Sequence, residues 1–66
     1  MKFLKIKKIS PTLQQVFFSA NGKLLGNFVM DVDGEFYFWP EEGESGGWSS
    51  YILEEIASKL KKINNE

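Results

Sequence analysis

Two dipeptides, Asn21-Gly22 and Asp33-Gly34, restrict the fold of this chain more than any other feature of the sequence. Each lies between two runs of apolar residues, which is the strongest short-range signal for a β-hairpin with a two-residue turn. Both central residues of that turn take positive φ, a conformation that asparagine, aspartate and glycine tolerate best. Residues 20–39 are therefore predicted to form one long strand between two tight turns, with parts of its two partner strands.

The sequence on either side completes the predicted sheet. Residues 2–9 mix lysines with apolar side chains, which suits a strand at an exposed sheet edge because charge there discourages pairing with other chains. Pro11 ends this strand, since proline has no backbone N–H to donate. The next three predicted strands cover residues 13–20, 23–32 and 35–39.

The last third of the chain predicts a single helix, separated from the strands by the polar segment 40–47. Ser49 is the expected N-cap, with Trp48 and Leu53 placed for a hydrophobic staple across it. Apolar residues then recur every three or four positions, at Ile52, Ile56, Leu60 and Ile63. The predicted fold class is α+β: a four-stranded antiparallel β-meander followed by one C-terminal α-helix packed on one sheet face, in one domain over residues 1–66.

The composition excludes several kinds of site. The 66 residues carry a net charge of -1 and contain no cysteine, no histidine and no arginine. Disulfides and thiolate metal sites are therefore excluded, and the commonest general base is missing. We expect a non-catalytic protein without a cofactor or a metal ion. No apolar stretch is long enough to span a bilayer, and lysines interrupt any signal-peptide pattern, so we expect a cytoplasmic protein without membrane contact.

The two predicted turns also decide which side chains share a sheet face, because directly opposed residues point to the same side. Two-residue turns place Phe18 opposite Leu25 and Val29 opposite Phe38. On this register one face carries Val16, Phe18, Leu25, Val29, Phe36 and Phe38. The other face carries Phe17, Leu24, Phe28, Met30, Val32, Tyr37 and Trp39, together with Leu4 and Ile6.

Both predicted faces are apolar, but only one helix is available to cover them. A helix is about 10 Å wide, whereas four strands about 4.8 Å apart span roughly 14 Å before side chains are added. The helix is expected on the Val/Leu/Phe face, which leaves the aromatic face to another molecule. We therefore predict a protein-interaction module, a homodimer or a small subunit, whose interaction face consists of Phe17, Phe28, Met30, Tyr37 and Trp39.

Two other functions fit some of the same residues. Aromatic side chains on a sheet stack bases in proteins that bind single-stranded nucleic acid, so the aromatic face is the alternative site for such a ligand. The acidic middle of the chain and the missing arginine argue against that ligand. A third hypothesis is a site for a divalent cation, formed by carboxylates in residues 31–35 and 41–44. Asp33-Gly34 nevertheless fits a hairpin turn better than a cation-binding loop.

The acidic loop, Glu41, Glu42 and Glu44, has three interpretations. It could hold a divalent cation, or it could mimic phosphates in contact with a nucleic-acid-binding partner. The third interpretation, a solvated connector between the sheet and the helix, is favoured because polar, glycine-rich segments usually serve as connectors.

The order of four strands and one helix resembles that of the small single-stranded-DNA-binding domain of transcriptional coactivators. The resemblance covers most of the chain and implies dimerisation through the helices and a basic binding face. The acidic charge and missing arginine of this chain differ from such a face. The short, lysine-rich, arginine-free composition also resembles that of small bacteriophage proteins, which would imply a host cytoplasm as the location and a host protein as partner.

Overall fold

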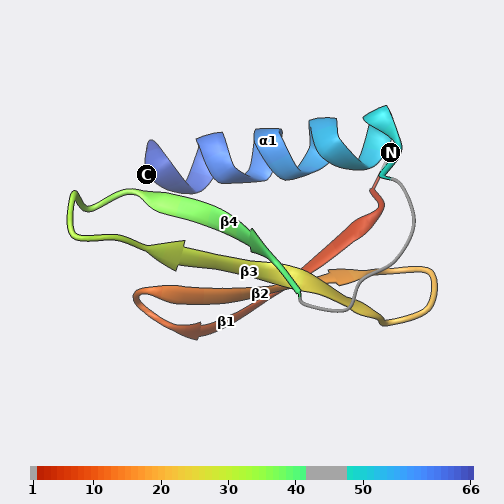
Figure 1. Cartoon of the computed structure of the whole chain (residues 1–66), viewed down its shortest axis with the longest axis horizontal. Helices are drawn as coiled ribbons and strands as arrows, with labels where there is room; N and C mark the ends of the chain where they lie inside the picture. Colours follow the sequence, from red (N-terminus) through yellow and green to blue (C-terminus); the bar gives the residue numbers. More distant parts are fainter. Residues whose placement is uncertain (1, 42–47) are drawn as a thin grey trace.

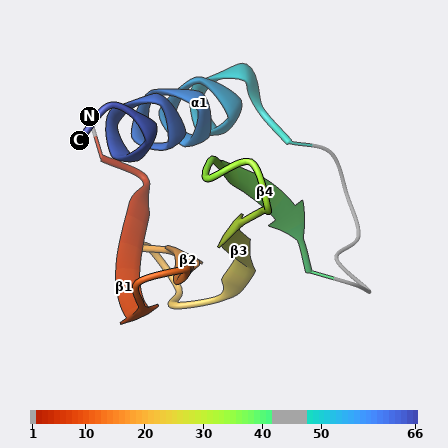
Figure 2. The same cartoon turned by 90° about the vertical axis from the view of Figure 1, so that its left-hand side faces the viewer.

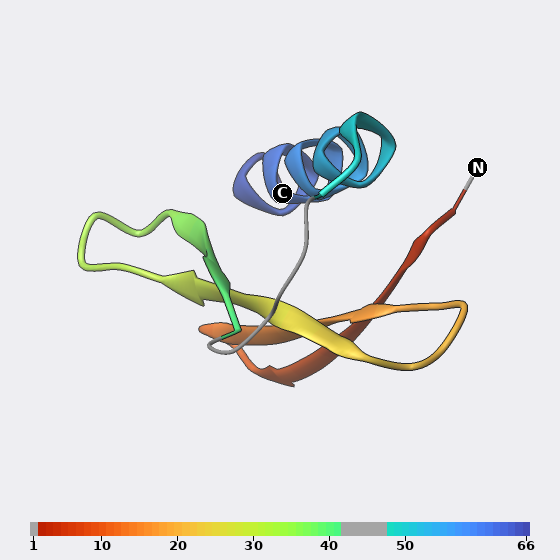
Figure 3. The same ribbon diagram turned by 45° about the vertical axis from the view of Figure 1, so that its right-hand side comes forward.

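The computed structural model describes residues 2–41 and 48–66 and confirms the predicted α+β class. One antiparallel sheet contains, in spatial order, β1 (Leu4–Ser10), β2 (Leu13–Phe18), β3 (Leu24–Met30) and β4 (Phe36–Pro40), and the helix α1 (Ser50–Asn64) follows. The sheet curls so that its edge strands, β1 and β4, flank the helix, which lies across the trough between them (Figure 1; Figure 2). The sheet thus has a concave inner face towards α1 and a convex outer face away from it (Figure 3).

The hydrophobic core fills the trough between the sheet and the helix. Phe28 and Val16 are completely shielded from solvent on the inner face. The rings of Phe28 and Phe38 meet edge to face at 5.8 Å, and Phe38 meets Trp48 in the same way at 5.6 Å. The buried core residues are Leu4, Val16, Leu25, Phe28, Phe36 and Ile56.

The helix begins at the predicted position. The Ser49 hydroxyl accepts a hydrogen bond from the backbone N–H of Ile52 at 3.3 Å, which confirms Ser49 as the N-cap. The last turn carries Lys61 and Lys62, whose charges interact favourably with the helix dipole. In place of the predicted staple, the Trp48 ring packs on Phe38 and Leu53 remains 51% exposed.

Two side chains of α1 bind the backbone of the two edge strands. The Glu55 carboxylate accepts hydrogen bonds from the backbone N–H groups of Phe3 at 2.6 Å and Leu4 at 3.0 Å. At the other end of the helix, Asn64 Oδ1 accepts from Phe36 N at 2.7 Å, and Asn64 Nδ2 donates to Phe36 O at 3.1 Å. These bonds anchor the helix at both ends and occupy backbone groups on the free edges of the sheet.

We expect the Asn64→Ala substitution to lower the free energy of unfolding by about 1–2 kcal/mol, because it removes two half-buried hydrogen bonds to the Phe36 backbone. Urea unfolding followed by circular dichroism measures the effect. Asn65→Ala is the matched control, since its side chain bonds only to the exposed end of the helix at Lys61 O, and we expect a change within about 0.5 kcal/mol. Equal effects of the two substitutions would contradict the anchoring role of Asn64.

The loop between β3 and β4 is not the predicted two-residue turn. Asp31 N donates to Glu35 O at 2.9 Å, so the loop holds the three residues 32–34. A second bond, from Gly34 N to Asp31 O at 3.0 Å, closes a β-turn within it. Gly34 has a φ of +83°, whereas Asp33 does not take positive φ. This is the three-residue hairpin loop in which a glycine in the left-handed region follows a turn.

The loop between β2 and β3 also differs from the prediction. Phe18 N donates to Lys23 O at 2.8 Å, which leaves four residues, 19–22, in the loop. Here too the glycine alone has positive φ, +71° at Gly22, while Asn21 instead accepts a hydrogen bond from Lys23 N through its side chain at 2.9 Å. One step further along β3, Leu25 forms a β-bulge, because Phe17 pairs with Leu24 and Val16 pairs with Gly26.

Candidate functional site

The helix leaves the outer face of the sheet uncovered, and three rows of directly opposed side chains cross this face. The first row contains Lys5, Phe17 and Leu24. The second contains Lys7, Gln15, Asn27 and Trp39. The third contains Leu13, Val29 and Tyr37. Two mainly apolar rows therefore lie on either side of a mainly polar one, so the outer face is less apolar than the sequence predicted.

Three of the five predicted interaction residues, Phe17, Tyr37 and Trp39, lie together on the outer face. The predicted placement of the other two is wrong. Phe28 has no exposed surface, and Met30 packs against the core from the inner face.

The physical reason lies in the β-bulge at Leu25 and in the β3–β4 loop, each of which shifts the pairing of its hairpin by one residue. The four-residue loop 19–22 by itself shifts the pairing by two residues, which leaves Phe17 and Leu24 on their predicted common face. A shift of one residue turns a whole strand over, so Phe28 and Met30 of β3 face inward and Val29 faces outward. The second shift turns β4 back relative to β3, which is why Tyr37 and Trp39 keep their predicted face. Leu4 and Ile6, predicted with the aromatic side chains, instead lie on the inner face opposite Phe18 and Val16.

The β3–β4 half of the outer face carries a group of apolar side chains that we call the aromatic patch. Tyr37 is 42% exposed and Trp39 is 62% exposed, while Val29 and Leu13 are partly buried beside them. A shallow hollow of about 280 Å³ lies next to Trp39, between Val29, Met30 and Asp31. The aromatic patch consists of Leu13, Val29, Tyr37 and Trp39.

Carboxylates gather beside the aromatic patch at the β3–β4 loop. The Tyr37 hydroxyl donates a hydrogen bond of 2.5 Å to Asp33 Oδ2. This bond lowers the pKa of Asp33 below its usual value, helped by the backbone N–H of Glu35. The same bond, together with the charges of Asp33, Glu35 and Asp31, raises the pKa of Tyr37. The loop therefore places negative charge beside the phenol ring.

The Asp33–Tyr37 bond predicts a pH dependence with a definite sign. Because the folded-state pKa of Asp33 is lowered, its stabilising effect is present above the usual value of 3.8 and is lost as the pH falls through the lowered pKa. Because the pKa of Tyr37 is raised, the stabilising effect of its protonated hydroxyl is present below the usual value of 10.0 and is lost as the pH rises through the raised pKa. The bond therefore stabilises the loop across the whole range between these limits.

We expect the Asp33→Asn substitution to move the pKa of Tyr37 down towards its usual value of 10.0, because the largest cause of the increase is removed. The ultraviolet absorbance of the phenolate reports this titration, in a Tyr51→Phe background so that Tyr37 is the one tyrosine observed. Asp31→Asn is the control and should give a smaller change, since its charge is the weakest contribution. Superimposable titration curves for the Asp33 variant and the parent would contradict the contact.

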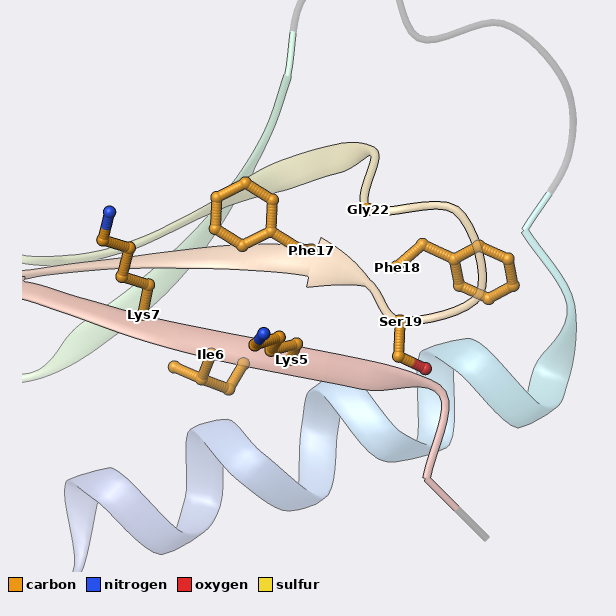
Figure 4. A pocket seen from close by; sticks show the side chains of 7 residues that line it. All are labelled: Lys5, Ile6, Lys7, Phe17, Phe18, Ser19 and Gly22. Carbon is orange, nitrogen blue, oxygen red and sulfur yellow. The ribbon is translucent and has the colours of Figure 1, made fainter.

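The β1–β2 half of the outer face has a different character. Lys5, Lys7 and Phe17 border a cavity of about 380 Å³, which Ile6, Phe18, Ser19 and Gly22 complete, and no carboxylate lines it. In Figure 4, Phe17 and Lys7 extend away from the helix and Ile6 extends towards it. We call this the basic cavity. The lysines were predicted at the sheet edge, but their position beside Phe17 was not predicted; it follows from the pairing of Lys5 with Phe17.

The acidic loop can be placed only in part. Glu41 is exposed directly after β4, and its backbone N–H donates to Leu25 O at 2.9 Å. Glu42 and Glu44 lie outside the described residues. Within residues 2–41 and 48–66, no group of three or more acidic side chains is arranged to hold a metal ion. The cation site considered for residues 31–35 therefore has no support from the geometry of that loop.

The close Tyr37–Asp33 pair is exposed on the surface, whereas catalytic pairs work in clefts that exclude water. What the outer face offers instead is contact area, through two exposed aromatic rings at one end and two ammonium groups beside a third ring at the other.

Comparison with protein families, with curated proteins and with solved structures finds no match to this chain. Element order is thus the one link to the coactivator domain, and it carries no further argument. Across the described residues, no helix has the length and apolar character needed to cross a membrane.

Proposed function

We propose that this chain is a non-catalytic protein-interaction module, which binds a second copy of itself or another protein through the aromatic patch. The observation that carries the proposal is the exposure of Tyr37 and Trp39 side by side with Val29 on an uncovered sheet face. Tyrosine and tryptophan dominate the binding energy of protein interfaces when they lie at the centre of the contact. Leaving a large apolar side chain in water forgoes about 1.5–3 kcal/mol of burial, so a partner that covers these rings gains substantially.

The surroundings of the aromatic patch indicate what kind of surface would fit it. Asp31, Asp33 and Glu35 border it at the loop end, and Glu41 follows Trp39 and Pro40 at the other end of β4. A partner with an apolar centre and a basic rim is therefore electrostatically complementary. The outer face is convex (Figure 2), so a concave partner surface would bury more area than a second copy packed face to face.

The experiment compares two aromatic side chains that are both exposed. The labelled chain is added to an extract of the cells that make it, and its sedimentation is measured for the parent, for Trp39→Ser and for Tyr51→Ser. Tyr51 is the matched control, because it is 67% exposed on the helix, away from the outer face. We expect the parent and the Tyr51 variant to sediment faster than a 7.6 kDa monomer, and the Trp39 variant to bind at least about tenfold more weakly.

Two further arms identify the partner. Sedimentation of the purified chain alone separates a second copy from another protein, since a homodimer forms without extract. Nuclease treatment of the extract should leave the complex intact if the partner is a protein. A parent chain that sediments as a monomer in extract and alone would overturn the proposal, and so would equal behaviour of the two variants.

A further inference from the structure

We propose that the basic cavity binds single-stranded nucleic acid, with a base stacked on Phe17 and the adjacent phosphates held by Lys5 and Lys7. This site lies on the β1–β2 half of the outer face, whereas the interaction proposed above uses the β3–β4 half, so the two proposals stand independently. The cavity measures about 380 Å³, and its lining includes two lysines and the partly exposed Phe17, the ring of the lining that lies on the outer face. It therefore combines the two features that such ligands require, an aromatic platform and positive charge along the backbone path.

The position of the lysines fits a phosphodiester chain that runs along β1. Lys5 and Lys7 are two residues apart on the same strand, so they point to the same side about 7 Å from each other. That spacing is comparable to the distance between consecutive phosphates in an extended single strand. Lys5 is also directly opposite Phe17, which sets the ring beside the phosphate path rather than on it. A nucleotide lying across β1 and β2 can thus contact the ring and an ammonium group at once.

The charge of the whole chain does not oppose this arrangement, because charge is separated across the sheet. No carboxylate lines the basic cavity. The carboxylates of Asp31, Asp33 and Glu35 belong to the β3–β4 loop, at the opposite side and the opposite end of the outer face. The net charge of -1 is a sum over the whole chain and does not by itself describe the potential at Phe17. Glu41, whose backbone N–H donates to Leu25 O, is the described carboxylate at the same end of the sheet, and it does not line the cavity.

The middle row of the outer face extends the site beyond one nucleotide. From Lys7 it continues through Gln15 and Asn27 to Trp39, across all four strands. Amide side chains both donate and accept hydrogen bonds, so they match the edges of bases that point from β1 towards β4.

The test uses fluorescence anisotropy of a labelled oligodeoxythymidine, titrated with the purified full chain at low salt. The informative variant is Lys5→Glu/Lys7→Glu. The matched control is Lys61→Glu/Lys62→Glu, which makes the same change in net charge on exposed residues of the last helical turn. A third variant, Phe17→Leu, keeps an apolar side chain but removes the ring.

We expect the Lys5/Lys7 variant to bind at least about tenfold more weakly and to reduce the slope of log affinity against log salt by about 1.4, as expected for two lost phosphate contacts. The helix control should change affinity less than about threefold, and Phe17→Leu should weaken binding with little change in the salt slope. Circular dichroism confirms that each variant is folded. No binding by the parent at low salt would overturn the proposal, and so would equal losses in the Lys5/Lys7 variant and the helix control.

Discussion

Substitution of Phe28 by alanine is expected to leave most molecules unfolded at room temperature. Phe28 has no exposed surface and lies in the middle of the trough, in edge-to-face contact with Phe38. Removing a buried phenylalanine ring costs about 3–5 kcal/mol, and a domain of fewer than about 70–80 residues rarely has more than that in reserve. Urea unfolding followed by circular dichroism should show the transition shifted to the lowest denaturant concentrations or lost.

The matched control is Phe17→Ala, because Phe17 is the partly exposed phenylalanine on the outer face of the neighbouring strand. We expect it to cost less than the Phe28 substitution, since part of the Phe17 side chain is already in contact with water. The milder variant Phe28→Leu should remain folded but less stable, which keeps the comparison measurable if the alanine variant cannot be purified. A stable Phe28→Ala protein, or a Phe17→Ala protein that loses as much stability as Phe28→Ala, would contradict the observed register and support the one that the turn signals predict.

Substitution of Gly26 by alanine is expected to lower the free energy of unfolding by about 1–3 kcal/mol through overpacking. A Cβ atom at this position would collide with the carbonyl oxygen of Trp39 and would lie 2.8 and 2.9 Å from two atoms of the Phe38 ring. The carbonyl belongs to the backbone of β4, so relief requires the strand itself to move. Thermal or urea unfolding measures the loss.

Gly22→Ala separates this effect from the general cost of replacing a glycine. Nothing lies within 4 Å of a Cβ at Gly22, but its φ of +71° strains any other residue, by about 1–2 kcal/mol. The two variants also differ in what they disturb. The Gly26 variant should increase hydrogen exchange of the Glu41 amide, which donates to Leu25 O beside Gly26, as β4 shifts, whereas the Gly22 variant should not. A Gly26→Ala protein as stable as the parent would contradict the close approach of β3 and β4.

The strands, their order and the helix could be predicted because each has a local cause. Pro11 lies in the turn that separates the first two strands, and Ser49 caps the helix. The apolar stripe of the helix, which includes Ile56, is buried only if the helix packs on a hydrophobic surface. These signals depend on neighbouring residues and survive without knowledge of the rest of the fold. The resulting topology, a meander with a helix over it, follows from short connections alone.

The faces of β3 could not be predicted from the dipeptides, because a turn signal determines neither the number of loop residues nor the presence of a bulge such as the one at Leu25. In Asp31-Val32-Asp33-Gly34-Glu35 the glycine suits either the second position of a two-residue turn or the third position of a three-residue loop. The structure has the latter. Val32, which the predicted strand 23–32 contained, is fully exposed in this loop.

The corrected register changes what the outer face can do. It loses Phe28 and Met30, and it gains Val29 and Asn27, the latter directly opposite Gln15 between the apolar rows. The chain therefore does not have two equally apolar faces, and the case for a partner rests on a smaller surface centred on Tyr37 and Trp39. The same correction places Lys5 and Lys7 beside Phe17, which removes one objection to a nucleic acid ligand, that lysines lie far from the aromatic side chains.

Site-specific photo-cross-linking at Trp39 tests most directly whether the aromatic patch is a binding surface. A photoreactive phenylalanine analogue is placed at position 39, or at the exposed control position 51, and the cells that make the protein are irradiated. The account predicts a discrete protein adduct from position 39, of twice the chain mass for a second copy or of another mass for a different partner, and little adduct from position 51. Equal yields from both positions, or no adduct from position 39, would contradict it.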